Sequence, residues 1–215
     1  MYKLFLFDFD GTLLDSDQMI LVTFLELYAK YRPNYHPGNE HMLTFSGPPI
    51  RQTLLKEFPN ENQQLMFDEF VKYSTINYDK YVKPFPYVIE MLNTFKKNEI
   101  KYGLITSKAR AATNYALKLT SLDGLFDFVI CADEVRNVKP DPEGVLLAMR
   151  HFNVLNKDEV IYIGDNMFDY QTAKNAKVTF GYVTFSPRTL DSGLKADVYI
   201  QNFKEFTEDV INGKH

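Results

Sequence analysis

The chain has 215 residues, 45% hydrophobic and 15% aromatic, which suffices for one large domain or for a core with one sizeable insertion and argues against bulk disorder. Its formal net charge of −4 argues against a nucleic-acid binder, which needs a basic surface. The single cysteine, Cys131, rules out an internal disulfide, and no apolar run approaches the roughly 20 residues that span a bilayer. We therefore expect a cytoplasmic protein that does not bind membranes.

The apolar run at 3–9 predicts a buried strand that carries Asp8 and Asp10 at its end. Because alternate residues of a strand point to the same side, these two carboxylates are expected to share one site. Gly11 then permits the sharp turn that the chain needs on leaving a sheet. Two close carboxylates at the end of an apolar strand are unfavourable unless a cation or phosphate-binding group offsets them. The alternative, a surface turn rich in Asp and Gly, is disfavoured by the apolar flank.

Residues 17–83 predict only helices and loops. Apolar residues recur at helical spacing from 17 to about 31 and from 61 to 81, and a further helix is expected to begin after Pro48-Pro49. The Pro-rich link at 83–86 ends this segment. Three residues are available to cap the first of these helices: Asp15, Ser16 and Asp17.

Beyond the link, apolar strands and amphipathic helices alternate. Strands are expected at 102–106, 127–131, 160–164, 178–184 and 198–200, and helices at 87–98, 109–119, 142–153 and 168–175. This alternation is typical of a parallel sheet covered on both faces, and the first strand belongs to that sheet. We therefore predict an α/β fold in which 1–16 and 84–215 form a Rossmann-like, doubly wound parallel sheet and 17–83 form an inserted all-helical domain.

Polar residues gather where the predicted strands end, at the sheet edge where ligands bind in open α/β folds. They are Asp8 and Asp10 after the first strand, Thr106 and Ser107 after the second, Lys139 after the third, and Asp165 and Asp169 after the fourth. As phosphate ligands, the two hydroxyl residues would use their hydroxyls and backbone N–H groups. Each cluster has a structural alternative: a helix cap at the hydroxyls, an ordinary surface lysine, and a turn at the last two aspartates.

The residue types favour metal-assisted phosphoryl chemistry. Clustered carboxylates without a nearby histidine suit a hard cation with oxygen ligands, which favours Mg²⁺ over Zn²⁺. A carboxylate is already ionised at neutral pH, so it is a nucleophile that needs no base. The cation, Lys139 and the hydroxyls can neutralise the attacked phosphoryl group. The second aspartate of the first pair can protonate the leaving alkoxide and later deprotonate water.

With these clusters in this order, the chain resembles the haloacid dehalogenase-like superfamily. The matching motifs are Asp8-Phe9-Asp10-Gly11-Thr12-Leu13, Thr106, Lys139-Pro140, and Gly164-Asp165 with Asp169. The resemblance implies that Asp8 is the nucleophile and Asp10 the general acid and base. It implies that Asp8, the Asp10 carbonyl and Asp165 hold Mg²⁺, with Asp169 in support. It also implies that Thr106 and Lys139 bind the transferred phosphoryl group.

The insertion matches the helical cap of that family. Ser46-Gly47-Pro48-Pro49-Ile50, followed by Arg51, is most similar to the phosphoglycolate phosphatase and small pyrophosphatase branches. We expect Arg51 to contact substrate, because a guanidinium suits a carboxylate or a second phosphate; a solvated helix face is the alternative. Tyr87 stands where relatives usually have glycine, a departure expected to stiffen or redirect the cap.

The leading hypothesis is a Mg²⁺-dependent phosphatase that hydrolyses a small phosphorylated metabolite, such as a phosphoglycolate-like phosphomonoester, through an aspartyl-phosphate. The alternatives are an inorganic pyrophosphatase and a sugar phosphomutase of the β-phosphoglucomutase type, which would return the phosphate to the sugar. A dehalogenase is disfavoured because Asp10 is present, and a carbon–phosphorus hydrolase would need a cap lysine, for which Lys56 has no recognisable setting. A non-catalytic phosphate-binding protein is disfavoured because no catalytic position is replaced. We expect a monomer or weak dimer.

Overall fold

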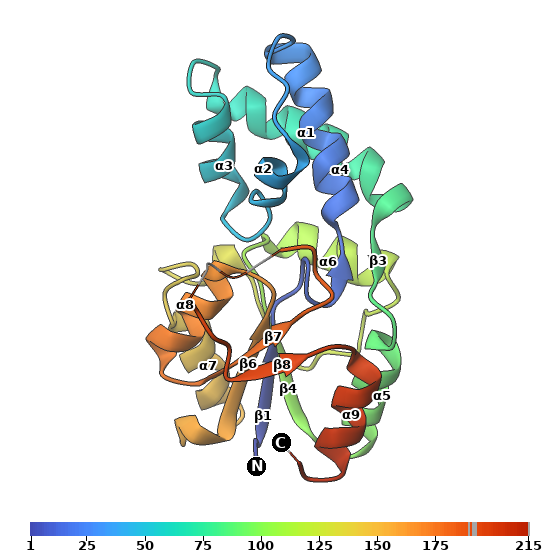
Figure 1. Cartoon of the computed structure of the whole chain (residues 1–215), viewed down its shortest axis with the longest axis vertical. Helices are drawn as coiled ribbons and strands as arrows, with labels where there is room; N and C mark the ends of the chain where they lie inside the picture. Colours follow the sequence, from blue (N-terminus) through green and yellow to red (C-terminus); the bar gives the residue numbers. More distant parts are fainter. Residues whose placement is uncertain (189, 191–192, 215) are drawn as a thin grey trace.

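A computed structural model describes residues 1–188, 190 and 193–214. Six parallel strands form one sheet in the order β5-β4-β1-β6-β7-β8 (Figure 1). The strands are β1 (Leu4–Phe7), β4 (Lys101–Ile105), β5 (Val129–Ile130), β6 (Val160–Gly164), β7 (Thr179–Val183) and β8 (Val198–Ile200). In the register, Phe7 of β1 lies opposite Leu104 on one side and Ile163 on the other. The predicted Rossmann-like α/β fold is confirmed.

Alternate side chains of β1 serve the two faces of the sheet. Phe5 and Phe7 join a core cluster with helices α5 (Val88–Lys97), α6 (Arg110–Leu119) and α9 (Phe203–Ile211). Leu4 and Leu6 join a second cluster with helices α7 (Glu143–His151) and α8 (Met167–Ala176). None of the four β1 side chains is more than 1% exposed, which is why the strand has no polar position. Figure 1 shows α5 and α9 on one side of the sheet and α7 and α8 on the other.

Residues 17–83 form a group of helices beyond the carboxyl ends of the strands (Figure 1). The group consists of α1 (Asp17–Tyr31), α2 (Asn39–Leu43), α3 (Ile50–Glu57) and α4 (Gln63–Tyr81). The Phe24 ring of α1 lies 4.4 Å from the Phe45 ring and 5.9 Å from the Phe70 ring, measured between centroids. The Tyr28 hydroxyl donates a hydrogen bond of 2.9 Å to Glu57. The insertion therefore packs around aromatic side chains that belong to the same core cluster as Phe5 and Phe7 of the sheet, and its status as a separate cap domain stays a prediction.

The insertion is joined to the sheet through a short two-stranded ribbon. Strands β2 (Leu14–Asp15) and β3 (Lys83–Pro84) pair antiparallel, so the chain enters and leaves the helices side by side. The prolines at 83–86 predict only a stiff link, and this pairing was not predicted. Two residues per strand are too few for an alternating pattern to be recognised.

Other boundaries also differ from the sequence-based expectations. Strand β1 ends at Phe7 and not at residue 9, and β5 has only two residues, which places the buried Cys131 just after it. Helix α9 was not predicted, although Asn202 marks its start by accepting a hydrogen bond of 2.8 Å from the Glu205 N–H. The five-residue α2 was also missed. No helix in the described part of the chain combines the length and apolar character that a membrane crossing requires.

The first residue before α5, Tyr87, has a left-handed backbone with a φ of 67°. Glycine adopts this conformation freely, whereas a residue with a Cβ loses about 1–2 kcal/mol. The departure from glycine noted in the sequence therefore lies at a position where the backbone favours glycine.

We expect Tyr87→Gly to be more stable than Tyr87→Ala by about 1 kcal/mol, because both variants remove the ring but only glycine relieves the backbone. Urea unfolding measures the difference as a shift in the midpoint, provided that the two variants have the same m-value. Equal midpoints would show that the left-handed residue is not strained.

Candidate active site

Three buried aspartates meet at the carboxyl edge of the sheet. Asp8 follows β1, Asp165 follows β6, and Asp169 lies in the first turn of α8. One carboxylate oxygen of each lies within 4.8 Å of the other two. The backbone holds them in place, because Asp8 N–H donates to the Ile163 carbonyl at 2.8 Å and Asp165 N–H donates to Asp169 Oδ2 at 3.2 Å.

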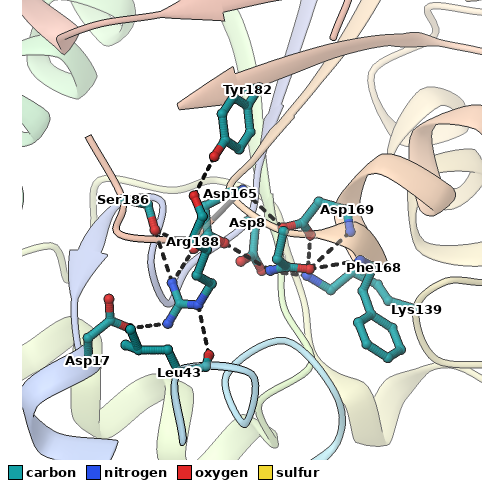
Figure 2. Close-up of polar contacts among 11 residues, drawn as sticks. Asp8, Asp17, Leu43, Lys139, Asp165, Phe168, Asp169, Tyr182, Ser186 and Arg188 are labelled. Carbon is teal, nitrogen blue, oxygen red and sulfur yellow. Dashed lines mark hydrogen bonds and ion pairs between the residues drawn. The ribbon is translucent and has the colours of Figure 1, made fainter. Parts of the chain in front are cut away.

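Lys139 lies between two of these carboxylates (Figure 2). Its Nζ is 2.5 Å from Asp8 Oδ1 and 2.8 Å from Asp169 Oδ1, and its side chain is only 4% exposed. The Tyr162 hydroxyl donates a further hydrogen bond of 3.2 Å to Asp169 Oδ1. Asp141 holds the following turn by accepting a hydrogen bond of 2.9 Å from the Glu143 N–H. The alternative of an ordinary surface lysine is therefore wrong.

The three carboxylates carry more negative charge than Lys139 can balance. Burial raises the pKa of Asp8, the Asp169 carboxylate raises it further, and the Lys139 ammonium opposes both. Burial likewise raises the pKa of Asp169, and the Lys139 ammonium opposes this shift. Burial alone would lower the pKa of Lys139, but Asp169 and Asp8 raise it well above its usual value. The excess of buried negative charge makes a bound cation favourable.

The donor atoms fit a hard divalent cation. Among the described residues, the group close enough to hold an ion offers carboxylate oxygens alone, from Asp8, Asp165 and Asp169, and this is the ligand set that Mg²⁺ prefers. The Asp10 carboxylate does not belong to this group, and the predicted role of the Asp10 carbonyl as a metal ligand stays a prediction. The carboxylate faces Lys108, whose Nζ lies 3.0 Å from Asp10 Oδ2.

The strand-alternation argument for Asp8 and Asp10 was wrong in its geometry, because β1 ends at Phe7, before both residues. The two residues are close in sequence, but their carboxylates contact different lysines: Asp8 contacts Lys139 and Asp10 contacts Lys108. Asp10 Oδ1 is buried and has no hydrogen-bond partner within the described residues. A polar atom in this state is suited to a ligand that completes its hydrogen bonds.

The residues after β4 do not cap a helix. Helix α6 begins at Arg110, after an N-cap residue, Ala109, that makes no side-chain cap. Thr106 Oγ1 instead accepts a hydrogen bond of 3.1 Å from the Lys108 N–H. The Ser107 hydroxyl is buried, and no described residue hydrogen-bonds with it. The helix-cap alternative is therefore wrong, and Ser107 keeps a free hydroxyl in this loop.

Lys108 lies at the same strand end as Thr106 and Ser107, and no role was predicted for it. Besides its contact with Asp10, its Nζ lies 5.1 Å from the ring centroid of Tyr78, on α4 of the insertion. Burial alone would lower the pKa of Lys108, but the Asp10 carboxylate raises it above its usual value. The sequence did carry a signal for Lys108, because it directly follows Thr106 and Ser107, which were predicted to bind phosphate.

Arg188 was also missed, and it joins the aspartate group to the insertion (Figure 2). Its guanidinium contacts Asp165 Oδ2 and Asp17 Oδ1, and its Nε donates to the Leu43 carbonyl at 3.2 Å. It lies against Gly11, whose φ of 85° is strained for any residue with a Cβ, and a Cβ there would overlap Arg188 Nη1 and the Asp165 carboxylate. Only glycine fits this turn.

Asp15, Ser16 and Asp17 were the candidate caps of α1, and no side-chain cap forms there. Ser16 occupies the N-cap position but makes no side-chain hydrogen bond there. Asp17 instead forms the buried ion pair with Arg188. Burial raises the pKa of Asp17 to about 6, and Arg188 opposes the shift.

Arg51 makes its contacts within the insertion. Its guanidinium lies 3.7 Å from the ring centroid of Phe67 and donates long hydrogen bonds of 3.4 Å to Gln64, both on α4. Its side chain is exposed. The insertion approaches the aspartates elsewhere, because a Cβ on Gly47 would lie 3.2 Å from the side chain of Asn166, the N-cap of α8.

The haloacid dehalogenase-like hydrolase family matches residues 5–183. The chain belongs to this family. A pyrophosphatase PpaX from Halalkalibacterium halodurans is 33% identical over 86% of this chain and 85% of its own length. The structure of a haloacid dehalogenase-like hydrolase from Bacteroides fragilis is similar, with 27% identity, a TM-score of 0.84, and 96% of this chain and 100% of that chain covered. The expected family and the expectation of an enzyme are confirmed.

A protein from Haemophilus somnus, named as a predicted phosphoglycolate phosphatase, shares the fold. It is 18% identical, with a TM-score of 0.78, and the match covers 100% of this chain and 98% of that chain.

We expect Lys139→Met to lower the free energy of unfolding by about 3–5 kcal/mol, because it keeps the volume of the stem but leaves Asp8 and Asp169 buried without their cation. Urea unfolding with EDTA present measures the change. Lys108→Met is the matched control and should lose less, since its partner Asp10 is 20% exposed. A similar loss of unfolding free energy in both variants would contradict the view that Lys139 balances buried charge more than Lys108 does.

Proposed function

We propose that this enzyme is a Mg²⁺-dependent phosphatase that hydrolyses a small phosphorylated metabolite through an aspartyl-phosphate on Asp8. The observation that carries the proposal is the buried group of Asp8, Asp165, Asp169 and Lys139 at the carboxyl edge of the sheet. The family match and the phosphatase names of relatives support the phosphatase class.

Asp8 is the nucleophile in this proposal. Lys139 binds Oδ1, so we assign Oδ2 to attack on phosphorus. The Oδ2–P bond forms as the bond from phosphorus to the leaving oxygen breaks. Lys139 and the hydroxyls of Thr106 and Ser107 contact the oxygens of the transferred group. Mg²⁺, held by Asp8, the Asp10 carbonyl and Asp165 with Asp169 in support, supplies charge neutralisation when bound.

Asp10 moves the proton in both steps. It first donates a proton to the leaving oxygen. It then takes a proton from the water that attacks phosphorus, which breaks the Oδ2–P bond and frees Asp8. Lys108 Nζ lies 3.0 Å from Asp10 Oδ2 and faces the negative charge that Asp10 carries after the first proton transfer.

The cation beside Asp10 favours a substrate whose leaving group is itself anionic. Because Asp10 must reach the leaving oxygen, Lys108 lies on the leaving-group side of phosphorus. A carboxylate, as in a phosphoglycolate-like ester, or a second phosphate, as in pyrophosphate, would pair with it. The Lys108 contact and the pyrophosphatase name of a relative support pyrophosphate hydrolysis as the second candidate function.

We expect Asp8→Asn to lose at least about a thousandfold in turnover, because the amide cannot form the aspartyl-phosphate. Phosphate release from phosphoglycolate, pyrophosphate and β-glucose 1-phosphate, with and without Mg²⁺, measures it. Asp123→Asn, at an exposed position, should match the wild type.

The same reactions separate the alternatives. Free phosphate supports the phosphatase, and an isomerised sugar phosphate supports a mutase. Turnover in Asp8→Asn at the wild-type rate would overturn the role of Asp8.

We expect Lys108→Ala to reduce kcat/KM about tenfold more for phosphoglycolate and pyrophosphate than for glycerol phosphate, whose leaving group is neutral. Equal losses on charged and neutral leaving groups in Lys108→Ala would contradict the preference for an anionic leaving group.

We expect Arg51→Ala to raise KM for the best substrate if Arg51 contacts it. An unchanged KM would show that Arg51 contacts only Phe67 and Gln64 within the insertion.

A further inference from the structure

Arg188 is a buried cation directly beside the proposed metal ligands (Figure 2). It enters from the segment after β7, and its side chain is 7% exposed. Its guanidinium contacts Asp165 Oδ2 and the Ser186 hydroxyl, which is 3.2 Å from Nη1. The mechanism proposed above does not use this residue.

Both carboxylate oxygens of Asp165 already have partners. Asn166 Nδ2 donates to Oδ1 at 2.9 Å. Ser186 donates to Oδ2 at 2.8 Å, and Arg188 contacts the same oxygen. A metal ion that takes an Asp165 oxygen would therefore lie next to the guanidinium. Two cations at such short separation repel each other strongly in a buried site. The pairing of Arg188 with Asp165 thus opposes metal binding.

The insertion holds the other half of the guanidinium. Asp17, the first residue of α1, pairs with Nη2, and the carbonyl of Leu43, at the end of α2, accepts from Nε. Asp17 Oδ2 is buried without a hydrogen-bond partner in the described structure. The negative charge of Asp17 therefore offsets part of the positive charge that the Arg188 guanidinium places near the metal ligands.

We propose that Arg188 is a positioning residue that sets the metal affinity of Asp165, and that Asp17 transmits the state of the insertion to that affinity. The inference rests on the proposed Mg²⁺ site. Removal of the Arg188 charge strengthens metal binding, and removal of the Asp17 charge weakens it. A purely structural role for the bridge predicts a loss of the same sign in both variants, because each substitution breaks the same ion pair.

The test is a titration with Mn²⁺, followed through the electron paramagnetic resonance signal of the free ion, which reports binding without turnover. We expect the Kd to fall about tenfold in Arg188→Gln and to rise several-fold in Asp17→Asn, as expected for removing one nearby charge of either sign. Lys174→Gln removes an exposed lysine of α8 that pairs with Asp197 and should leave the Kd unchanged. Arg188→Lys keeps the charge and should bind Mn²⁺ more weakly than Arg188→Gln.

The outcomes separate the inference from the proposed function. An unchanged or raised Kd in Arg188→Gln, or an unchanged or lowered Kd in Asp17→Asn, overturns the inference and leaves the metal site intact. A wild-type protein that binds no Mn²⁺ overturns the metal site itself. Should Arg188→Gln not fold, as judged by circular dichroism, Arg188→Met, which also removes the charge, is titrated in its place; a fall in the Kd supports the inference, and an unchanged or raised Kd overturns it.

Discussion

The burial of three aspartates beside a lysine that pairs with two of them is the constraint on which this structure depends. The central strand β1 is apolar on both faces, so it delivers Asp8 into the interior, where a lone carboxylate is strongly unfavourable. Lys139 offsets part of that charge and simultaneously contacts Asp169, which ties β1 to α8. The remaining negative charge favours a bound cation. The buried negative charge that the fold must neutralise is therefore also the charge that could hold a catalytic cation.

Much of the fold could be predicted because its signals are local. The apolar run of β1 and the helical spacing of α1 follow from side-chain patterns within a few residues, and α1 begins and ends at Asp17 and Tyr31 as expected. The ribbon of β2 and β3 and the five-residue α2 have too few residues to carry a pattern. Their formation depends on partners far away in the chain.

The candidate site likewise contains residues that could be predicted from local patterns and residues that could not. Asp8, Lys139, Asp165 and Asp169 follow predictable strands, so the parallel topology alone brings them to one edge. Arg188 has no such signal, because it lies in an irregular segment and its partner Asp17 is 171 residues away. The direction of the Asp10 side chain was also beyond reach, since it depends on where β1 stops. The sequence therefore indicates which strand ends meet, but not which loop cations approach them.

The turn between Asp10 and β2 has a mechanical consequence. Leu14 N–H donates to the Phe9 carbonyl at 2.9 Å, Gly11 N–H donates to the Leu14 carbonyl at 2.7 Å, and Phe85 N–H donates to the Leu13 carbonyl at 2.9 Å. Asp10, the proposed proton donor, therefore lies in the turn that connects the sheet to the helices, whereas Asp8 is hydrogen-bonded to the neighbouring strand β6. A rocking motion of the helices would displace Asp10 relative to Asp8. Such a turn would let the closed position of the helices decide when a leaving group is protonated.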